Sequence, residues 1–570
     1  MPLVQVWKLA PSDPGHERLS LTLGLHPTTH FKYIGPGSLH EDLLLDFIDP
    51  AYRYHNEQDA SKFCRVAKGV TFLARLDATI DSGTTAANRA EAEAVEHVVH
   101  PHGPGLVDLY FRIVHPSYPI LHKNVFLERY LRDNRASVLP APLLAAVYLL
   151  AMDWWEYDPA LAGPGTDTAG DQNGIKPDIE ALGRLASHSL MTAIQQPKLS
   201  TVQACLLLLQ RSATISAHAV GAGGSGGDVW VLTSQLVAIA EELGLHVDCT
   251  LWNIPVWEKG LRKRLAWATL MQDKWSSLIY GRPSHVQASH WRIPQLSLDD
   301  FVEEDVDRNE INNNSQGDDY AEVEKGRLLF IHLARLTEVM AEALGTFYSH
   351  DPVRHAAFST SDVMHTIESV KPVALRLREW ATDLPSCLRM EAVRPRKLCS
   401  NGYLLLSYFV TEIMVYRCIV RSLGRRPPRF DSDEPLAASS HQDSAALVNL
   451  CREAAKMRLL HVMRFVEALR PEHLQAFWWF ASARSLAYIR TYVSILWATS
   501  RCADEAEYYR QKLDEFRWSL RVRARGVAFV STALRDMGES LEDIDMSEPP
   551  SSSKKANDFT NTASSAERRQ

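Results

Sequence analysis

Residues 258–280 read EKGLRKRLAWATLMQDKWSSLIY, and this stretch decides the fold class. Its apolar residues recur at helical spacing, and the Gly281-Arg282-Pro283 triplet that follows ends the helix. One face carries Leu261, Leu265, Ala268, Trp275 and Ile279, and it is widened by Trp267, Leu270, Met271 and Leu278. An apolar stripe this wide predicts a helix that lies in the core of the protein.

The charged residues of the same stretch lead to separate expectations. Glu258 and Arg262 are four residues apart and are expected to form an ion pair near the start of the helix. The triplet Arg262-Lys263-Arg264 is expected to lie on the solvated face of the helix. Asp273 lies among apolar residues and therefore needs a partner, for which Arg282 is the candidate.

Further segments on both sides of this stretch show the same helical periodicity. The longest apolar run, 141–152, is too short for a membrane span of about 20 residues and predicts a buried helix. The sequence therefore predicts an all-α fold with one large helical body. The other predicted helices are 106–115, 124–130, 143–155, 182–194, 202–213, 229–243, 321–348, 362–381, 403–423, 444–469, 473–498 and 503–537.

Only the N-terminal residues alternate with the period of a strand. Leu19, Leu21, Leu23 and Leu25 alternate with polar or small residues, and Phe31 and Tyr33 follow a turn-like segment, which predicts a small β-hairpin. The expected organisation is a lead-in with this hairpin (1–80), a linker (81–105), the helical region (106–537) with an acidic loop at 298–320, and a disordered acidic and Ser-rich tail (538–570).

Composition excludes several classes of protein. The chain has 570 residues, with 61 Lys or Arg against 69 Asp or Glu, so the net charge is −8. This net negative charge argues against a protein that binds nucleic acid over its whole surface. The eight cysteines include no CxxC pair, so zinc fingers, zinc ribbons and thioredoxin-type centres are unsupported. Without a secretory signal or an apolar span of about 20 residues, we expect a soluble intracellular protein with no membrane partner.

Two stretches match signatures of active sites. The run GAGGSGG at 221–227 fits both GxGxxG and GxSxG, but both sites require a preceding strand, and 202–213 reads as a helix. A mobile loop is expected there. Asp299, Asp300 and Glu303 fit the DDxxE pattern, in which carboxylates of terpene-synthase-like helical enzymes hold Mg²⁺ against a diphosphate. The neighbouring acids favour a solvated loop, but a Mg-dependent enzyme remains the alternative function.

The remaining clusters have simpler interpretations. His97, His100 and His102 are interrupted by Pro101 and predict a loop cluster rather than a metal site. The basic stretch 425–429 is a loop that could serve as a localisation or phosphate patch. Core packing is expected for the helical tryptophans, with a small-molecule pocket lined by some of them as the alternative: Trp154, Trp155, Trp267, Trp275, Trp478 and Trp479. No residue is assigned as catalytic, cofactor-binding or metal-binding.

An ordered set of motifs resembles the middle homology region of fungal zinc binuclear cluster transcription factors, also called the fungal-specific transcription factor domain or xylanolytic activator regulatory domain. The first motif runs from Leu106-Val107-Asp108-Leu109-Tyr110-Phe111 to Tyr118-Pro119-Ile120-Leu121-His122, and the second from Trp230 to Glu242-Leu243-Gly244-Leu245-His246. The third combines Arg262-Lys263-Arg264-Leu265-Ala266-Trp267, Gln272-Asp273-Lys274-Trp275 and Gly281-Arg282-Pro283. Their order and spacing agree with the family over about residues 100–420.

The chain departs from the family pattern in one respect. Family members carry six cysteines near the N-terminus, which bind two zinc ions and place a short helix in the major groove of DNA. These 570 residues contain no such cluster. We expect either a member without the cluster or a cluster encoded upstream of Met1. In either case zinc is expected only in the missing cluster, and this chain is expected to bind no specific DNA by itself.

The resemblance implies a nuclear regulator of RNA polymerase II transcription, represented here by its regulatory region, and not an enzyme. Its expected partners are the transcriptional machinery or a coactivator, with a small-molecule effector and a homodimer as further alternatives. DNA is a partner at the level of the family. A helical scaffold without any ligand is the third interpretation. In the tail, Glu539, Glu542, Asp543 and Asp545 alternate with Leu541, Ile544 and Met546, as in acidic activation segments.

Overall fold

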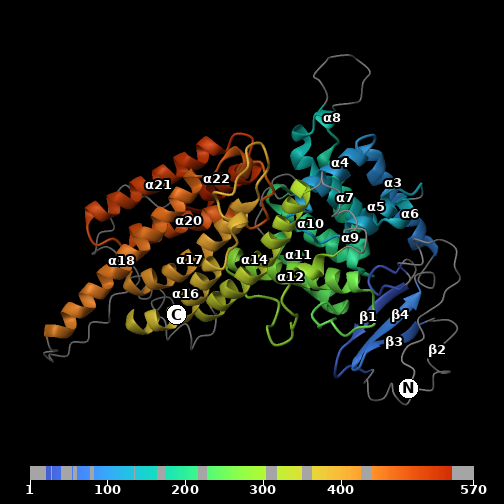
Figure 1. Ribbon diagram of the computed structural model, residues 1–570, viewed down its shortest axis with the longest axis horizontal. Coiled ribbons are helices and arrows are strands. Elements are labelled where there is room, and N and C mark those ends of the chain that lie inside the picture. The colour runs from blue at the N-terminus through green and yellow to red at the C-terminus, as the bar shows by residue number, and fades with distance from the viewer. Residues whose placement is uncertain are drawn as a thin grey trace, which may run out of the picture. The chain divides into compact units, whose positions relative to one another are not determined.

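A computed structural model describes residues 19, 21–26, 29–39, 54–55, 61–76, 82–133, 135–162, 175–215, 227–302, 317–348, 363–424 and 438–541 (Figure 1). The chain divides into two compact units. Unit 1 comprises 1–337 together with 385–401 and 476–480, and unit 2 comprises 338–384, 402–475 and 481–570. The single helical region expected over 106–537 is therefore split between two units, and two short segments from the second half of the chain belong to unit 1.

Unit 1 begins with a small antiparallel sheet. Its strands are β1 (Thr29–Ile34), β2 (Tyr54–His55), β3 (Ser61–Ala67) and β4 (Val70–Leu76), in the spatial order β1-β4-β3-β2. β3 and β4 form a hairpin around Gly69, whose φ of 73° suits the tight turn. The expected β element is confirmed, but the proposed pairing is wrong: β1 pairs with β4, and Leu19–Leu25 contribute no strand. Leu19, Leu23 and Leu25 are buried, but Leu21 is 47% exposed and Thr22 is buried, so the alternation of residue types does not correspond to an alternation of burial.

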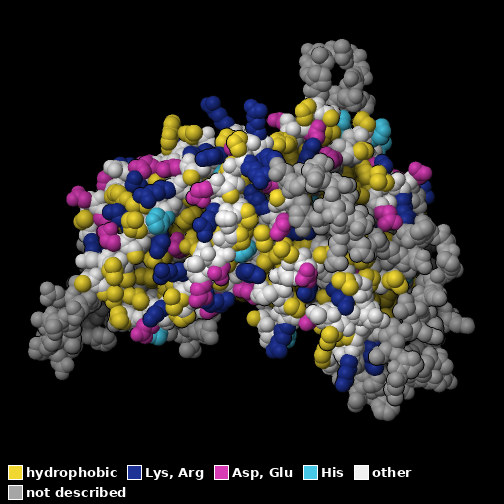
Figure 2. All heavy atoms as spheres, viewed as in Figure 1, with side chains coloured by type: hydrophobic (Ala, Val, Ile, Leu, Met, Phe, Trp, Pro, Cys, Tyr) yellow, Lys and Arg dark blue, Asp and Glu magenta, His cyan; other side chains and the backbone are white. Residues whose placement is uncertain are grey.

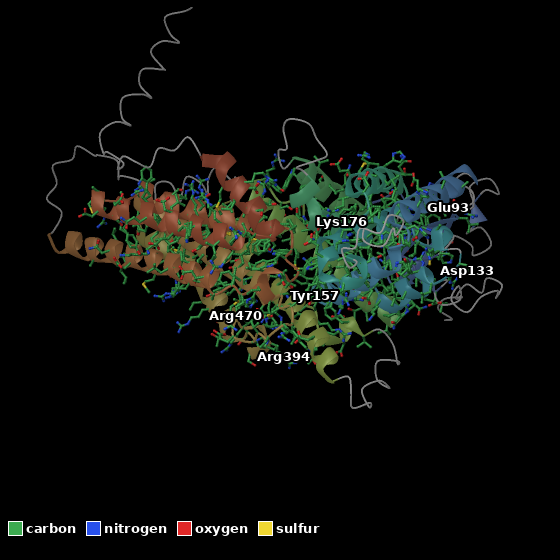
Figure 3. The ribbon with its side chains drawn as sticks, turned by 90° about the horizontal axis from the view of Figure 1, so that it is seen from above. Glu93, Asp133, Tyr157, Lys176, Arg394 and Arg470 are labelled. Atoms are coloured by element: carbon green, nitrogen blue, oxygen red, sulfur yellow. The ribbon has the colours of Figure 1, made fainter. Side chains whose placement is uncertain are left out.

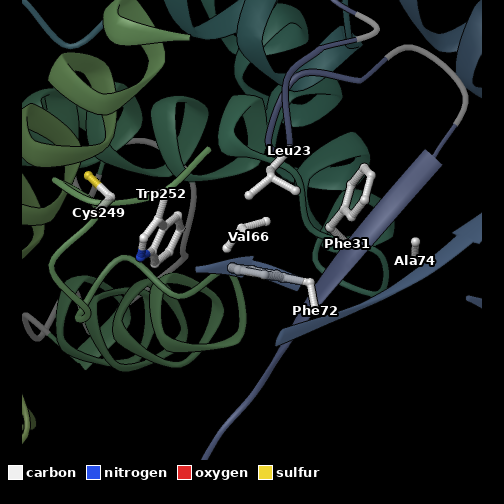
Figure 4. Packing of buried hydrophobic residues seen from close by; sticks show 7 residues of the cluster. All are labelled: Leu23, Phe31, Val66, Phe72, Ala74, Cys249 and Trp252. Carbon is white, nitrogen blue, oxygen red and sulfur yellow. The ribbon is translucent and has the colours of Figure 1, made fainter. Parts of the chain in front are cut away.

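One face of the sheet packs on the helical part of unit 1. Figure 4 shows the ring of Phe72 of β4 beside Val66 of β3 and directed toward the ring of Trp252, which precedes α12 (Val256–Tyr280). Phe72 and Trp252 meet edge to face with ring centroids 5.3 Å apart. The backbone N–H of Asn253 also donates to the carbonyl of Val66 at 2.8 Å. The sheet is therefore anchored to the chain just before α12 by apolar packing and by a backbone hydrogen bond.

The helices of unit 1 surround α7 (Ala141–Ala151), all eleven residues of which are buried. Segment 81–105, expected to be a linker, instead contains α3 and the start of α4, because its alanines favour a helix and Ala92, Val95 and Val99 form a buried stripe. The helix expected at 106–115 ends as a single π-helical turn, η3. The elements not yet bounded are α3 (Ser82–Val99), α4 (Gly103–Leu109), η3 (Tyr110–Val114), α5 (Lys123–Tyr130), α6 (Arg135–Val138), η4 (Met152–Tyr157), α8 (Pro159–Ala162), α9 (Ile179–Ala193), α10 (Leu199–Ile215), α11 (Gly227–Glu242), η5 (Leu298–Phe301) and η6 (Ser386–Leu388).

Unit 2 is a bundle of long helices. The helix expected at 503–537 is two helices, because Gly526 adopts a φ of 74° between Arg523 and Ala528. The helix expected at 473–498 is likewise interrupted between α19 and α20. The elements are α16 (Val363–Thr382), α17 (Asn401–Gly424), α18 (Ala438–Glu467), α19 (Pro471–Leu474), α20 (Ser482–Ala498), α21 (Ala503–Arg523) and α22 (Ala528–Leu541), and α14 (Gly317–Phe347) runs from unit 1 into unit 2.

Helix α17 is the one described segment with the length and apolar composition of a membrane span, over Asn401–Leu423. Of that window, 72% is buried inside the fold. Buried residues at regular intervals, among them Leu406, Val410, Ile413 and Met414, make it a core helix. The expected tail begins at the last turn of α22, and residues 542–570 lie outside the described residues.

Candidate functional site

The first two parts of the third sequence motif lie on α12, and its last part, Gly281-Arg282-Pro283, directly follows this helix. Most of α12 is buried. Trp267 is 2% exposed and Trp275 is fully buried, which confirms the predicted core helix. The expectation of a solvated face is wrong for Arg262 and Arg264, which are each 2% exposed. Because neighbouring segments cover α12 on all sides, its charged side chains have to find partners inside the protein.

Glu258 joins α12 to the N-terminal lead-in. Its carboxylate is fully buried and accepts the backbone N–H groups of Leu23 and Gly24 at 3.1 and 3.0 Å. Arg262 donates from Nε to the same carboxylate at 2.9 Å. Arg262 also donates from Nη1 to the carbonyl of Leu243 at 2.9 Å, and its guanidinium lies 5.2 Å from the centre of a Trp252 ring. The pair therefore fastens the lead-in and the end of α11 to one point of α12.

The backbone at Gly24 fits this junction closely. A Cβ atom at Gly24 would lie 2.2 Å from Cγ of Leu199, at the start of α10. The N–H of Leu199 donates to the carbonyl of Gly24 at 3.1 Å. Any other side chain at position 24 would therefore push the lead-in away from α10 and α12.

Arg264 joins α12 to the first motif. Its Nη1 donates to the carbonyl of Pro119 at 2.8 Å and approaches that of Leu121 at 3.4 Å. Gln203 of α10 donates to the carbonyl of Ile120 at 2.9 Å, and His122 contacts the ring of Trp257 with centroids 4.7 Å apart. The irregular segment after η3 is thus held by side chains from α10 and α12.

Lys263 joins α12 to η5 by pairing with Asp300, one of the three carboxylates of the expected Mg²⁺ motif. Its Nζ lies 2.9 Å from Oδ1 of Asp300, whose other oxygen accepts the N–H of Ser297 at 2.9 Å. The backbone of Asp300 packs against Gly260, where a Cβ would lie 2.5 Å from its carbonyl oxygen. Asp300 is therefore a structural partner and cap. Asp299 shares η5 with Asp300, and Glu303 lies outside the described residues. Among the residues that the structure describes, these carboxylates form no group that could hold a metal ion.

Asp273 has partners, but Arg282 is not among them. Its carboxylate accepts Ser284 Oγ at 2.5 Å, the N–H of His285 at 2.8 Å and the N–H of Val286 at 3.2 Å. Lys274 Nζ lies 3.5 Å away, and burial lowers the pKa of this amine while Asp273 raises it in part. Arg282 instead lies 5.6 Å from the centre of a Trp230 ring. The turn after α12 thus folds back onto the carboxylate of Asp273.

His246 connects the sheet to the end of the second motif. Its ring meets Tyr33 of β1 with centroids 5.2 Å apart, and Trp291 lies on its other side at 6.2 Å. Burial and the neighbouring His290 lower the pKa of His246, so its neutral form is favoured. Together with the packing of Phe72 on Trp252, this contact joins the sheet to the segment between α11 and α12.

Residues that could hold a metal do not converge in the described part of the chain. His102 stacks edge to face on Trp155 at 4.9 Å, and no group of three or more His, Cys, Asp or Glu among the described residues could bind an ion. Figure 3 shows Glu93, Asp133 and Lys176 lying apart from one another on the outside of unit 1. Residues 221–226 of the glycine run and the basic stretch 425–429 lie outside the described residues.

Most of the tryptophans singled out above are core residues. Trp155, Trp267, Trp275 and Trp479 are buried, and Trp275 meets Trp479 edge to face at 5.1 Å. Trp275 also donates from Nε1 to Thr337 at 2.9 Å. Trp154 and Trp478 are half-buried. A small-molecule pocket lined by some of them stays a prediction.

The anchoring roles of Glu258, Arg262 and Arg264 were missed from the sequence. The signal in the sequence was the wide apolar stripe, because a helix with such a stripe exposes little of its surface to solvent. Charges on such a helix are expected to be buried and paired. Their partners are backbone groups far away in the sequence, and no local pattern identifies those.

Comparison with known proteins adds an independent line of evidence. Residues 107–380 match the model of the fungal specific transcription factor domain. The chain is 34% identical over 475 residues to the transcriptional activator protein DAL81 of Saccharomyces cerevisiae, which covers 78% of this chain and 44% of that protein. It is 29% identical over 272 residues to the uncharacterized transcriptional regulatory protein C25B8.11 of Schizosaccharomyces pombe, covering 48% of this chain and 34% of that protein.

A third relative is cutinase transcription factor 1 alpha of Fusarium vanettenii, 23% identical over 317 residues, with 55% of this chain and 30% of that protein covered. The chain spans less than half the length of each of these relatives. No solved structure matches. These relatives support a transcription regulator and not the Mg-dependent enzyme that Asp299, Asp300 and Glu303 suggested.

Proposed function

Because residues 107–380 belong to the family of fungal specific transcription factor domains, we propose that the chain is the regulatory region of a nuclear regulator of RNA polymerase II transcription. The family resemblance inferred from the sequence motifs is confirmed by this match. The observation that carries the proposal is the position of those motifs: the carbonyls of Pro119 and Leu243, from the first and second motifs, accept hydrogen bonds from Arg264 and Arg262 of α12. The motifs are thus parts of one structural core.

The proposed role is to transmit regulatory state to other proteins, without catalysis. The charged side chains of α12 bind backbone carbonyls and N–H groups of unit 1. These side chains therefore stabilise the fold. A coactivator or the transcriptional machinery would bind the outer surface of the folded chain. A small-molecule effector and a homodimer belong to the same proposal as further partners.

We also propose that these 570 residues bind neither zinc nor specific duplex DNA by themselves. The eight cysteines are dispersed and the net charge is −8. Burial raises the pKa of Cys249 to about 11 and that of Cys205 to about 12, which disfavours the thiolate that zinc requires. Elemental analysis of the purified chain should find less than one zinc per chain, and two zinc ions per chain would refute this part.

A reporter assay tests the regulatory role. The whole chain is fused to an unrelated DNA-binding domain and expressed in a fungal cell, and reporter transcription is compared with that of the DNA-binding domain alone. We expect transcription to change in the presence of the chain. The matched variant Leu541→Ala, Ile544→Ala and Met546→Ala tests the C-terminal segment as the coactivator contact. Transcription equal to that of the DNA-binding domain alone would contradict the proposal.

A further inference from the structure

The exposed side of α21 carries two large apolar side chains. Trp518 is 66% exposed and Val522 is 56% exposed, and their spacing of four residues places them on one side of the helix. The opposite side carries Leu513, Phe516 and Leu520, which are buried in unit 2. Apolar side chains exposed on adjoining turns form a patch that another protein surface can cover.

The charges around this patch are sorted by sign along the helix. All five acidic residues of α21 lie within 504–515, whereas 516–525 contain four arginines and no acidic residue. Glu507, Asp514 and Arg521 are spaced by seven residues, or about two helical turns, so they lie on the same side of α21. Figure 2 shows Lys and Arg side chains standing out where α21 ends. The exposed side of α21 therefore has an acidic half and a basic half.

The charged groups next to the apolar patch are accessible to a partner. Arg521 is exposed, and within the part of unit 2 that the structure describes no ion pair is seen for it. Asp514 and Glu507 both pair with Arg510, yet their side chains stay 59% and 46% exposed. Both halves of the face can thus form further ion pairs without a change in the fold of unit 2.

Two such helices complement each other when they run antiparallel. We propose that α21 of a second copy of this chain docks on this face, with the two-fold axis beside Arg517. Residues on opposite sides of the axis then face each other. Arg521 of one copy comes within about one residue of Asp514 of the other, an axial offset of about 1.5 Å that the side chains can bridge. Symmetry forms this ion pair twice, and the two Trp518 rings cover each other at the axis.

The order of the charges favours a second copy over other occupants. Two copies in parallel would set arginines against arginines, which repel each other. Nucleic acid and a uniformly acidic protein segment would both meet the carboxylates of Glu507 and Asp514. A second copy in the antiparallel direction presents both signs in the reverse order and matches both halves. One helix face is small beside the about 800 Å² per partner of a standard interface, so the dimer is reversible and depends on concentration.

The homodimer belongs to the function proposed above, and the surface named here rests on that part of it. The regulatory role and the dimer can fail separately, because sedimentation reports association and the reporter assay reports transcription. A dimer without an effect on the reporter would contradict the regulatory role alone.

Analytical ultracentrifugation of the full chain over a range of concentrations tests the dimer. The wild type should shift from monomer to dimer as its concentration rises. Arg521→Glu sets acids opposite acids and Asp514→Arg sets arginines opposite arginines, so each variant should dimerise about tenfold more weakly. Lys371→Glu and Glu368→Arg are the matched controls, because they make the same changes of charge at exposed positions of α16. Both controls should dimerise as the wild type does.

Mixing the two charge variants makes the test specific. At the paired positions Arg521→Glu carries acids alone and Asp514→Arg carries arginines alone, so an equimolar mixture should associate at least as strongly as the wild type. Far-UV circular dichroism should be unchanged in every variant, because the altered side chains are exposed. A wild type that stays monomeric, a dimer that Arg521→Glu leaves unchanged, or a mixture that does not associate would each overturn the proposal.

Discussion

The backbone N–H of Gly24 donates to Oε1 of Glu258 at 3.0 Å, across 234 positions of sequence. The same carboxylate accepts the N–H of Leu23 and the Nε of Arg262, so one buried side chain joins the lead-in to α12. Buried carboxylates are stable only when such partners replace water. The stability of unit 1 should therefore depend strongly on this junction.

The first prediction concerns the charge of Glu258. Glu258→Gln keeps the shape of the side chain but leaves the guanidinium of Arg262 buried without an anion, and it should lower the free energy of unfolding by about 3–5 kcal/mol. The measurement is a urea titration followed by circular dichroism. Because Glu258→Gln with Arg262→Met removes both charges, the double variant should be less destabilised than Glu258→Gln alone. Equal loss in both variants would show that the pairing of charges is unimportant.

The second prediction concerns the close contact at Gly24. Gly24→Ala places a Cβ against the side chain of Leu199, so the lead-in or α10 has to shift, at a cost of about 1–3 kcal/mol. Gly183 in α9 is the control, because a Cβ there meets nothing within 4 Å. In that helix Gly183→Ala should stabilise the protein by about 0.5–1 kcal/mol. A neutral result for Gly24→Ala would mean that the lead-in is not seated on α10 as described.

The fold class could be predicted from the sequence because it depends on local periodicity. The apolar stripe with Trp267 and Trp275 identifies α12, and Gly281 with a φ of 61° ends it as expected. The sheet was predicted only in part, because the partner of Phe31 is Ala74 on a strand 43 positions away. No local pattern fixes such a pairing, and basic residues such as Lys62 and Arg75 obscure the alternation of β3 and β4.

The candidate site was less predictable than the fold, for a related reason. Arg262 and Arg264 look like solvent-exposed residues because arginine is mostly exposed in proteins. Their acceptors are the carbonyls of Leu243 and Pro119, and every residue type carries such a group. Sequence reasoning found that Asp273 needs a partner but could not find backbone N–H groups at the turn formed by His285 and Val286.

The third prediction separates the true partners of Asp273 from Arg282. Asp273→Ala removes the acceptor of Ser284 Oγ and of two backbone N–H groups and leaves the amine of Lys274 without its counter-ion, and it should cost about 3–5 kcal/mol. Arg282→Ala should cost less than about 1 kcal/mol, because Arg282 is exposed and only lies over Trp230. Chemical unfolding of both variants provides the measurement. A large loss of stability for Arg282→Ala would contradict the prediction and indicate that Arg282 is a partner of Asp273.

The fourth prediction concerns pH and unit 2. Burial raises the pKa of Glu412 above its usual value, although Arg458, 3.3 Å away, opposes the shift. The folded state therefore binds this proton more tightly, and the free energy of unfolding falls as the pH rises from about 4.3, the unfolded pKa, through the folded pKa. Glu412→Gln removes this titration and should gain stability relative to the wild type between about pH 4 and pH 7.

A matched glutamate serves as control for the pH experiment. Glu453 of α18 is exposed, so Glu453→Gln removes the same charge without removing a buried carboxyl. Urea midpoints of the wild type and the two variants are compared across the pH range. The difference between Glu412→Gln and the wild type should grow with pH, while that for Glu453→Gln should stay nearly constant. A difference for Glu412→Gln that shrinks with pH would reverse the sign and contradict the prediction.

The last prediction compares a buried tryptophan with an exposed one. Trp267 is 2% exposed, and its Nε1 donates to the carbonyl of Pro294 at 2.9 Å, so Trp267→Ala removes a large ring from a packed core and should cost about 3–5 kcal/mol. Trp267→Phe keeps most of the apolar volume but leaves that carbonyl without its donor, and it should cost about 1–3 kcal/mol. Trp518→Ala removes a ring that is 66% exposed and should change stability by less than about 0.5 kcal/mol. Thermal and urea unfolding of the three variants test this order, and a loss below about 1 kcal/mol for Trp267→Ala would place that ring outside the core.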